Sequence, residues 1–283
     1  MASEGGAAFD LFEGDALIAS SAQPHWAQGL MPAIYVSHGA PPLFDNAQWM
    51  RELHQWALRM PKPKGIISVS AHWEARPIAV TAAGPDIPLV YDFGGFHPRF
   101  YSMQYRTPDA SALSVRVTAE LAGLGPVRQS NRGIDHGTWV PLKVMYPLAD
   151  VPVVQVSLPT HDPALLLKVG ERLKALRAEG VLIIGSGFMT HGLPYLDAAM
   201  ISGSVPSWSS DFDLWVQTAL HSGDLDVLIN YLQQAPGLPY AHPTVEHFVP
   251  LFVTLGAADS PQAAQTEIDG YFWGLSKRSL SFS

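Results

Sequence analysis

From residue 33 onward, short apolar runs alternate with longer stretches that carry apolar residues at helical spacing. The short runs are rich in Val and Ile, which favour buried strands, and the longer stretches favour helices that cover a sheet. Strands are predicted at 33–37, 65–70, 77–81, 151–157, 180–186 and, near the end of the chain, around 270–275. Helices are predicted at 46–60, 109–123, 139–147, 162–177, 211–221, 224–234 and 244–255. This alternation is typical of an α/β fold, and we expect a single domain with a central mixed β-sheet flanked by helices.

The first 30 residues differ from the rest, because they contain many small residues and have weak periodicity. We predict that residues 1–30 form an N-terminal arm or a peripheral turn outside the core. No repeat and no linker divides residues 31–283, which are expected to form one domain. A chain of 283 residues is long enough to bury a large core.

Charge and hydropathy restrict the class of partner. The 25 acidic and 17 basic residues give a formal net charge of −8, and Lys and Arg form no cluster, which argues against a nucleic-acid partner. No apolar run approaches the roughly 18 residues of a membrane span, and the acidic N-terminus does not resemble a secretory signal. We therefore predict a cytoplasmic protein that binds a small molecule and no membrane.

The chain contains no cysteine and eleven histidines. Disulfides, thiolate catalysis and cysteine-type metal sites are therefore excluded, and any metal ion would bind to His, Asp or Glu. The histidines are consequently the side chains whose positions carry the functional argument.

Three histidines follow predicted strands, namely His38, His72 and His191. The carboxyl ends of strands in an open α/β sheet form the edge at which ligands bind. Three imidazoles delivered to this edge predict a metal site there. The alternatives are that His38 is a turn residue and that His72 is a strand-end histidine packed on Trp73.

Two other segments place histidines where they can reach a site. His136 lies between Asp135 and a glycine, which suits a loop residue. Near the end of the chain, Thr244 is predicted to cap a helix whose first turn contains Glu246 and His247, and the positive end of that helix favours a neutral imidazole. Adjacent helical residues diverge by about 100°, so only one of this pair is expected to bind a metal ion. Glu246 would give a site of two histidines and one carboxylate, and His247 would give a site of three histidines.

The stretch from residue 84 to residue 105 is crowded with Gly, Pro and aromatic residues. Loops of this length in compact domains are usually functional. His97 lies in this loop, where it can contact a substrate.

Several segments carry a family resemblance: SHGAPPLF, SAHWE, YDFGGFHPRFYSMQY, DHGTWVPL, PVVQVSL, GSGFMTHGL and HPTVEHFVPLF. In order and spacing they resemble the class III extradiol ring-cleaving dioxygenases, specifically the bacterial 4,5-DOPA dioxygenase-like group. The resemblance covers about residues 31–275. It implies that residues 31–283 form a catalytic domain with a mononuclear non-haem Fe(II), or Zn(II), at the carboxyl ends of the strands.

The resemblance also assigns roles to individual histidines. It implies metal ligands at His38, His72 and His247, and so favours His247 over Glu246. It makes His191 an acid/base group or a further ligand, and His136 a hydrogen-bonding partner of the substrate or of O₂. The implied reaction is extradiol (meta) cleavage of a catechol-type diol by O₂, which gives a muconic semialdehyde-type product.

The expected substrate contacts are Tyr91, Phe96, His97, Phe188 and His242. For the aromatic residues among them, packing within the fold is the simpler alternative. The chain departs from the family in the aromatic loop, where Gly94 and His97 stand in place of a Tyr and a Pro that are often seen.

Two rival functions use the same histidines. The first is a zinc-dependent hydrolase that activates water, and the second is a non-catalytic protein that binds a metal ion or a small aromatic molecule. As partners of the favoured enzyme we expect an aromatic diol and O₂, and the chain is expected to be a monomer or a homodimer.

Overall fold

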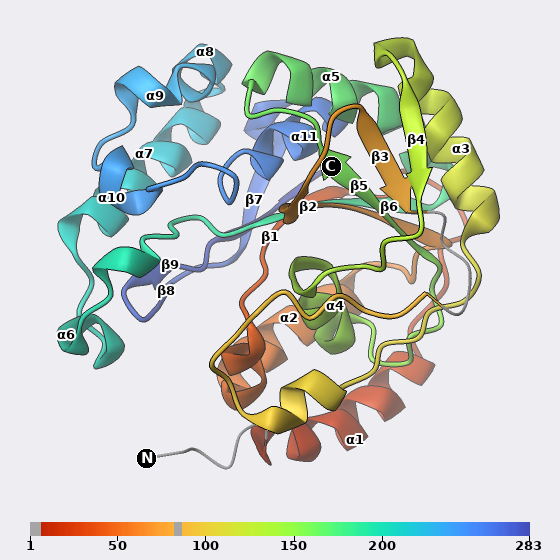
Figure 1. Ribbon diagram of the computed structural model, residues 1–283, viewed down its shortest axis with the longest axis horizontal. Helices are drawn as coiled ribbons and strands as arrows, with labels where there is room; N and C mark the ends of the chain where they lie inside the picture. Colours follow the sequence, from red (N-terminus) through yellow and green to blue (C-terminus); the bar gives the residue numbers. More distant parts are fainter. Residues whose placement is uncertain (1–6, 82–86) are drawn as a thin grey trace.

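The computed structural model describes residues 7–81 and 87–283, and it confirms the predicted α/β fold (Figure 1). The main sheet contains, in spatial order, β4 (Val127–Ser130), β3 (Ile78–Thr81), β5 (Val153–Leu158), β2 (Gly65–Glu74), β6 (Val181–Gly187), β1 (Ala33–Ser37), β10 (Ser279–Phe282) and β7 (Ala264–Ile268). A separate hairpin is formed by β8 (Tyr271–Phe272) and β9 (Leu275–Ser276).

The sheet is mixed, as expected. Its centre is parallel, because β2 pairs with β5 and with β6, and β6 pairs with β1. Antiparallel pairing begins beyond the central strands, where β3 meets β5 on one side and β10 meets β1 and β7 on the other. The central strands are buried along nearly their whole length, which explains why their Val- and Ile-rich runs could be identified in the sequence.

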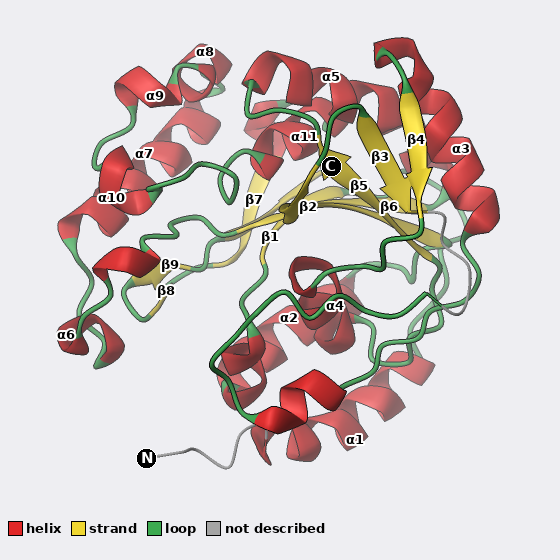
Figure 2. Ribbon diagram, in the orientation of Figure 1, coloured by secondary structure: helices red, strands yellow, loops and turns green. Residues whose placement is uncertain are grey.

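Helices cover both faces of the sheet (Figure 2). One face is covered by α3 (Ser111–Leu121), α5 (Pro163–Leu173) and α11 (Pro250–Ala257), with α7 (Ser207–Ser222), α8 (Leu225–Ile229), α9 (Tyr231–Gln234) and α10 (Leu238–Ala241) beside them. The other face is covered by α1 (Ala7–Ser21), α2 (Ala47–Arg59) and α4 (His136–Met145), and the short α6 (Ala198–Ile201) lies near the hairpin. Successive strand residues alternate between the two resulting cores: Ile34 and Val36 face α2 and α4, and Tyr35 faces α11.

The N-terminal region departs from the prediction of an arm. Residues 7–21 form helix α1, which packs on α2 and buries Phe9 in the core. Gln23 then anchors the chain by donating to the backbone carbonyls of Ala57 and Met60 at 2.7 and 2.9 Å. The helix was hidden in the sequence because Leu11 and Ile18 are exposed, so its apolar residues do not form one stripe. Residues 1–6 of the predicted arm lie outside the described residues.

Two helix starts also differ from the prediction. Pro250 is the first residue of α11, and residues 244–249 form turns in front of it. Thr244 does not cap this helix, because its hydroxyl donates to Glu246 at 3.0 Å. Pro is favoured in the first turn of a helix because that turn needs no backbone donor, which accounts for the late start of α11 at Pro250.

The second helix that differs is α4. It begins at His136 itself, directly after Asp135, so that histidine is not a loop residue.

The long aromatic loop follows β3. Its first residues, including Gly84, lie outside the described residues, and residues 87–105 run across the carboxyl edge of the sheet. In the two described ranges, no helix has both the length and the apolar character needed to cross a bilayer.

Candidate metal centre and active site

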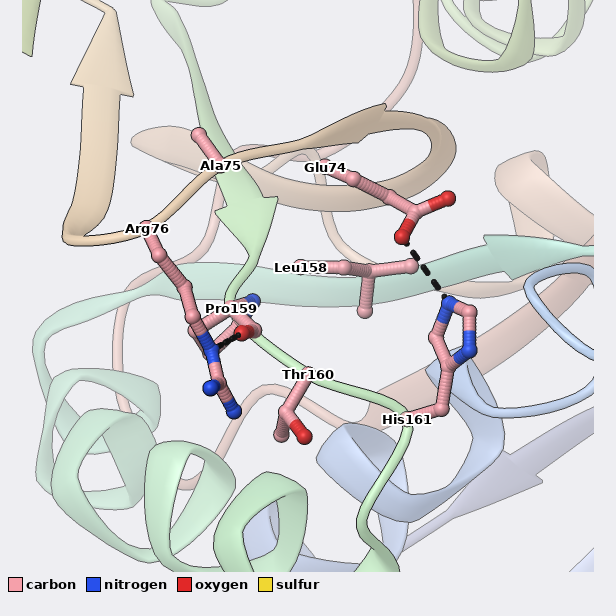
Figure 3. A pocket seen from close by; sticks show the side chains of 7 residues that line it. All are labelled: Glu74, Ala75, Arg76, Leu158, Pro159, Thr160 and His161. Carbon is pink, nitrogen blue, oxygen red and sulfur yellow. Dashed lines mark hydrogen bonds and ion pairs between the residues drawn. The ribbon is translucent and has the colours of Figure 1, made fainter.

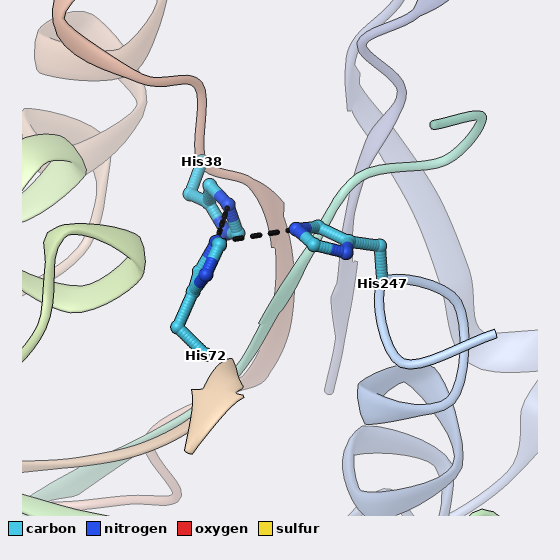
Figure 4. A group of neighbouring side chains, drawn as sticks. All are labelled: His38, His72 and His247. Carbon is cyan, nitrogen blue, oxygen red and sulfur yellow. Dashed lines mark hydrogen bonds between the residues drawn. The ribbon is translucent and has the colours of Figure 1, made fainter. Parts of the chain in front are cut away.

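Three histidines converge where β2, β6 and β1 end side by side (Figure 4). His38 directly follows β1, and His72 lies inside β2, which extends four residues beyond the predicted end of that strand. His247 comes from the turns before α11, and its carbonyl accepts from the amide of Phe188 at 2.9 Å and from the Tyr35 hydroxyl at 2.8 Å. These bonds tie the distant C-terminal segment to the strand ends.

The separations of the ring nitrogens fit a single metal ion. The Nε2 atom of His72 lies 3.2 Å from Nε2 of His38 and 3.2 Å from Nε2 of His247. One ligand atom from each of the three rings lies within 4.8 Å of the others. Metal–nitrogen bonds of about 2.1 Å at angles of 90–109° place ligand nitrogens roughly 3.0–3.4 Å apart. The three imidazoles therefore fit one divalent cation.

A hydrogen-bond chain sets the tautomer of His38. Pro141 lies inside α4 and has no amide proton, so the helix leaves the carbonyl of Gly137, four residues earlier, without its usual partner. The hydroxyl of Ser186 donates to this carbonyl. Because its proton is used there, Ser186 Oγ can only accept from Nδ1 of His38, at 3.0 Å. The proton of His38 is thereby held on Nδ1, and the Nε2 lone pair faces the other two rings.

A carboxylate plays the same part for His247, and a more distant one faces His72. Nδ1 of His247 lies 3.0 Å from Glu246, and Nδ1 of His72 lies 3.5 Å from Asp92. Glu246 therefore acts as an acceptor that orients its neighbour. Such outer partners of metal-binding histidines fix the ring and raise its basicity. The Nε2 atoms of His38 and His247 consequently both face Nε2 of His72 with their lone pairs, an arrangement that a cation stabilises.

Burial keeps these imidazoles neutral. Burial, reinforced by the neighbouring imidazoles, lowers the pKa values of His38 and His247 well below their ordinary value. For His72, burial and then His136 lower the pKa to about 4, although Asp135, Asp92 and Glu246 act in the opposite direction. Neutral imidazole is the form that binds metal ions.

Two further histidines border this centre. The ring of His191 is stacked on that of His247, with centroids 3.5 Å apart and an interplanar angle of 7°. Burial, followed by the effect of His242, lowers the pKa of His191 to about 3. His136 has its ring centroid 4.0 Å from that of His72, and its Nδ1 lies 2.8 Å from Asp92.

Asp92 links two of these rings. It accepts from the backbone amide of His136 at 3.1 Å as well as from the imidazole. Burial alone would raise the pKa of Asp92, but the hydrogen bond from His136 and the nearby imidazoles lower it to about 2. Asp92 is therefore an anion that orients both His136 and His72.

The backbone comes unusually close to the centre at two glycines. A Cβ atom on Gly137 would lie 2.5 Å from Ser70 Oγ and 3.0 Å from a ring carbon of His72. A Cβ atom on Gly187 would lie 2.0 Å from the carbonyl oxygen of His247. Only glycine permits these approaches, so both positions are part of the construction of the site.

A cavity of about 330 Å³ opens directly onto the histidines. Its polar lining consists of four of these histidines and Asp92, and its walls are mainly apolar: Pro42, Phe93, Phe96, Phe188, Leu193, Phe272, Trp273 and Leu275. Small-molecule sites have this character, with apolar walls and a few convergent polar groups.

The residues predicted to bind substrate fall into two groups. Phe96 and Phe188 line the cavity. Tyr91 instead donates to the carbonyl of Met103 at 2.5 Å, and His97 is exposed and lies beside a neighbouring cavity. His242 is buried behind the site, with Nε2 2.9 Å from the carbonyl of Met189. These three residues do not line the cavity at the histidines.

Sequence reasoning missed Asp92 and Ser186, and the single strand predicted around 270–275 is instead the β8–β9 hairpin. An acidic residue inside the aromatic loop was a signal for Asp92. The role of Ser186 depends on the carbonyl of Gly137, which is 49 residues away in the sequence, and no local pattern reveals it.

Another cavity, of about 400 Å³, lies beyond the ends of β2 and β5 (Figure 3). Glu74 and His161 face each other across it at 3.0 Å, and Arg76 donates to the carbonyl of Pro159. It contains one imidazole and one carboxylate, and none of the predicted site residues lines it. The histidine cluster is therefore the better candidate for the active site.

A model of one protein family, the catalytic LigB subunit of aromatic ring-opening dioxygenase, matches residues 31–276. The chain belongs to this family. It is a class III extradiol ring-cleaving dioxygenase, and the dioxygenases of the LigB family depend on a metal ion and act on an aromatic substrate with O₂. Because the family consists of dioxygenases, this membership argues against the two alternative functions, a zinc-dependent hydrolase and a non-catalytic protein that binds a metal ion or a small aromatic molecule.

Relatives of this LigB-family chain are similar over most of their length. A 4,5-DOPA dioxygenase extradiol of Beta vulgaris is 39% identical over 82% of this chain and 88% of the relative. A protein of the same description from Escherichia coli K12 is 35% identical over 86% of this chain and 91% of the relative. A crystal structure of an uncharacterized Escherichia coli K12 protein has a TM-score of 0.75 and 32% identity, and covers 89% of this chain and 100% of that protein.

Proposed function

We propose that this dioxygenase cleaves a catechol-type diol in the extradiol (meta) position and gives a muconic semialdehyde-type product. We further propose Fe(II) as its metal ion, with His38, His72 and His247 as ligands. The observation that carries this proposal is the convergence of three Nε2 atoms, each with its Nδ1 facing an outward hydrogen-bond or ion-pair partner. The 4,5-DOPA dioxygenases among the relatives support a catechol-type substrate.

The proposed metal supplies the chemistry that these side chains lack. Held by His38, His72 and His247, Fe(II) would supply Lewis-acid and redox chemistry toward the diol and O₂, whereas Zn(II) would fit the same nitrogens without redox chemistry.

His191 is the proposed acid/base group. It is neutral at pH 7, so it can take a proton from a diol hydroxyl that enters the cavity. Its ring is held in place by stacking on His247, so the proton is taken at a defined position and can be returned later in the reaction. General acid–base assistance of this kind is worth roughly 10²- to 10⁴-fold in rate.

His136 is the proposed second hydrogen-bonding group. Asp92 holds its Nδ1, so its other ring nitrogen is left for a ligand in the cavity that it lines. The substrate ring is expected to lie against Phe93, Phe96 and Phe188, which exclude water from the reacting atoms.

The test is anaerobic loading with Fe(II), followed by measurement of O₂ uptake on a catechol and of the yellow ring-opened product. Loading with Zn(II) is the matched control and is expected to give no uptake. His38→Ala is expected to abolish metal retention, and His191→Ala is expected to retain the metal and lose turnover. Full metal retention in His38→Ala, or no O₂ uptake by the Fe(II)-loaded protein with any catechol, would contradict the proposal.

The oligomeric state stays a prediction. The chain is expected to be a monomer or a homodimer, and sedimentation analysis would distinguish the two.

A further inference from the structure

A second cavity, of about 800 Å³, adjoins the cavity at the histidines. The two share four lining residues, namely Pro42, Phe96, Phe272 and Trp273. We propose that the second cavity, hereafter the annex, is a binding subsite for a substituent on the ring of the diol. The substituent that fits is an elongated chain with a neutral or cationic end, such as a primary amine, and an anionic end is disfavoured. This inference rests on the proposed function, which places the diol itself at the metal centre.

The wall shared by the two cavities is held firmly in place. It is formed in part by the β8–β9 hairpin, whose turn contains Trp273 at φ 51° and Gly274 at φ 70°. A bulky residue with a positive φ is rare and is retained only where the surrounding structure requires it. The hairpin is fastened at Ser276, whose amide donates to Thr190 at 2.7 Å and whose hydroxyl donates to Asp213 at 2.6 Å. Phe272 and Trp273 therefore form a fixed boundary for a ligand.

One lip of the cavities carries no side chain at two consecutive positions. Gly94 lines the cavity at the histidines, and Gly95 lines the annex. A Cβ atom built on either glycine would meet nothing within 4 Å. Open space therefore continues from one cavity toward the other along this lip, and a ring substituent can follow it.

The charges around the two cavities decide which substituent is accepted. Among the described residues that line them, there is no Lys and no Arg. The annex is lined by the carboxylate of Asp45 and by two further polar side chains, Asn46 and His97. A carboxylate on the substrate would lose hydration there without gaining a cationic partner.

The guanidinium of Arg99 interacts electrostatically with Asp45 but lines neither cavity. Arg99 follows His97 in the loop, and Asp10 accepts from it through both oxygens at 2.7 and 3.2 Å. An ammonium group in the annex, in contrast, would be attracted by the carboxylate of Asp45 and by the faces of Phe96 and Trp273.

The experiment compares three catechols that differ only at position 4 of the ring: 4-methylcatechol, 4-(2-aminoethyl)catechol and 3-(3,4-dihydroxyphenyl)propanoate. The kcat/KM of the Fe(II)-loaded enzyme is measured by O₂ uptake, and Kd is measured by anaerobic titration. We expect kcat/KM for the amine to exceed that for the propanoate by about tenfold or more, which corresponds to about 1.4 kcal/mol.

Two variants test the annex itself. Ala47 lines the annex and not the cavity at the histidines, so Ala47→Trp is expected to lower the amine-to-methyl ratio of kcat/KM about tenfold. Gln48→Trp, at the next and exposed position of α2, is the matched control and should leave that ratio unchanged. Asp45→Asn, which keeps the side-chain shape, is expected to lower the amine-to-propanoate ratio about two- to fivefold, the effect of one exposed charge.

The outcomes separate the two proposals. If catechols are cleaved but Ala47→Trp and Gln48→Trp give the same ratio, the annex does not bind the substituent. If the propanoate is used as well as the amine, the inferred charge preference is wrong. If no catechol is cleaved, the proposed function fails, and the anaerobic Kd values still show whether the annex distinguishes the three compounds.

Discussion

Ser186→Ala is the most informative single change, because this hydroxyl connects a helix carbonyl to the imidazole of His38, a proposed metal ligand. In the native protein Ser186 donates to the carbonyl of Gly137 and accepts from Nδ1 of His38. Alanine removes both bonds at once and introduces no charge and no larger group. The imidazole of His38 then has no acceptor for its Nδ1 proton, and the tautomer with Nε2 protonated becomes competitive.

The expected effect on metal affinity follows from this loss of orientation. Removing an outer partner of a metal-binding histidine costs about 10- to 100-fold in affinity, or about 1.4–2.8 kcal/mol. A second effect is expected on folding, since the Gly137 carbonyl is left buried without a donor, at a cost of about 1–3 kcal/mol. Metal affinity and stability are therefore both expected to fall.

The assay is a competition titration of Fe(II) or Zn(II) against a chelator of known affinity, combined with chemical denaturation of the metal-free protein. Ser68→Ala is the matched control: Ser68 is also a buried strand serine bonded to α4, through Thr138 at 2.8 Å, but it bonds to no imidazole. It should lose a similar amount of stability and keep its metal affinity. Equal metal affinity in Ser186→Ala and Ser68→Ala would refute the reasoning.

Three further changes test other parts of the structure. Asp213→Asn breaks a buried bidentate pair with Arg278, whose two bonds measure 2.7 and 2.8 Å, and should lower the free energy of unfolding by about 3–5 kcal/mol in denaturant titrations. Gly137→Ala should sharply reduce metal content in elemental analysis, because the added methyl group would collide with Ser70 and with the ring of His72. Normal metal content in this variant would contradict the prediction. Burial, partly offset by its bond to a backbone carbonyl, lowers the pKa of His242 from 6.5 to about 4, so its stabilising effect is complete above pH 6.5 and is lost as the pH falls toward 4. His242 should therefore contribute up to about 3 kcal/mol to the loss of stability between pH 7 and pH 4. Unfolding titrations at the two pH values should show a smaller loss in His242→Gln than in the native protein, and equal losses in the two proteins would contradict this.

The central fold was predictable because each strand of the parallel centre carries its own signal. The run at 33–37 coincides with β1, and the runs at 151–157 and 180–186 lie within one or two residues of β5 and β6. Of the strands outside this centre, β3 coincides with the run predicted at 77–81, whereas β4 and β10 carried no such signal. The two middle residues of β4 are exposed, and β10 alternates Ser with apolar residues and takes its place by pairing with β1.

The site was predictable to the extent that a histidine follows a strand or belongs to a family motif. His38 and His72 could be placed at the sheet edge by this rule, and the structure brings both together with His247. The environment of these residues could not be predicted, because it depends on contacts between distant segments. Asp92 reaches His136 across 44 residues, and a local argument from an N-cap misplaced the start of α11 while still naming His247.

The cluster also explains why metal binding and folding should be coupled in this chain. His38 and His72 come from the first third of the sequence and His247 from the last, so the three nitrogens meet only when β1, β2 and the turns before α11 are in place. Burying neutral imidazoles with facing lone pairs opposes folding, and a cation removes that opposition. A ligand that binds only the folded state at 100 times its Kd adds about 2.7 kcal/mol of stability. Chelation of the metal should thus lower the melting temperature of the native chain, and it should leave that of a His38→Ala variant unchanged.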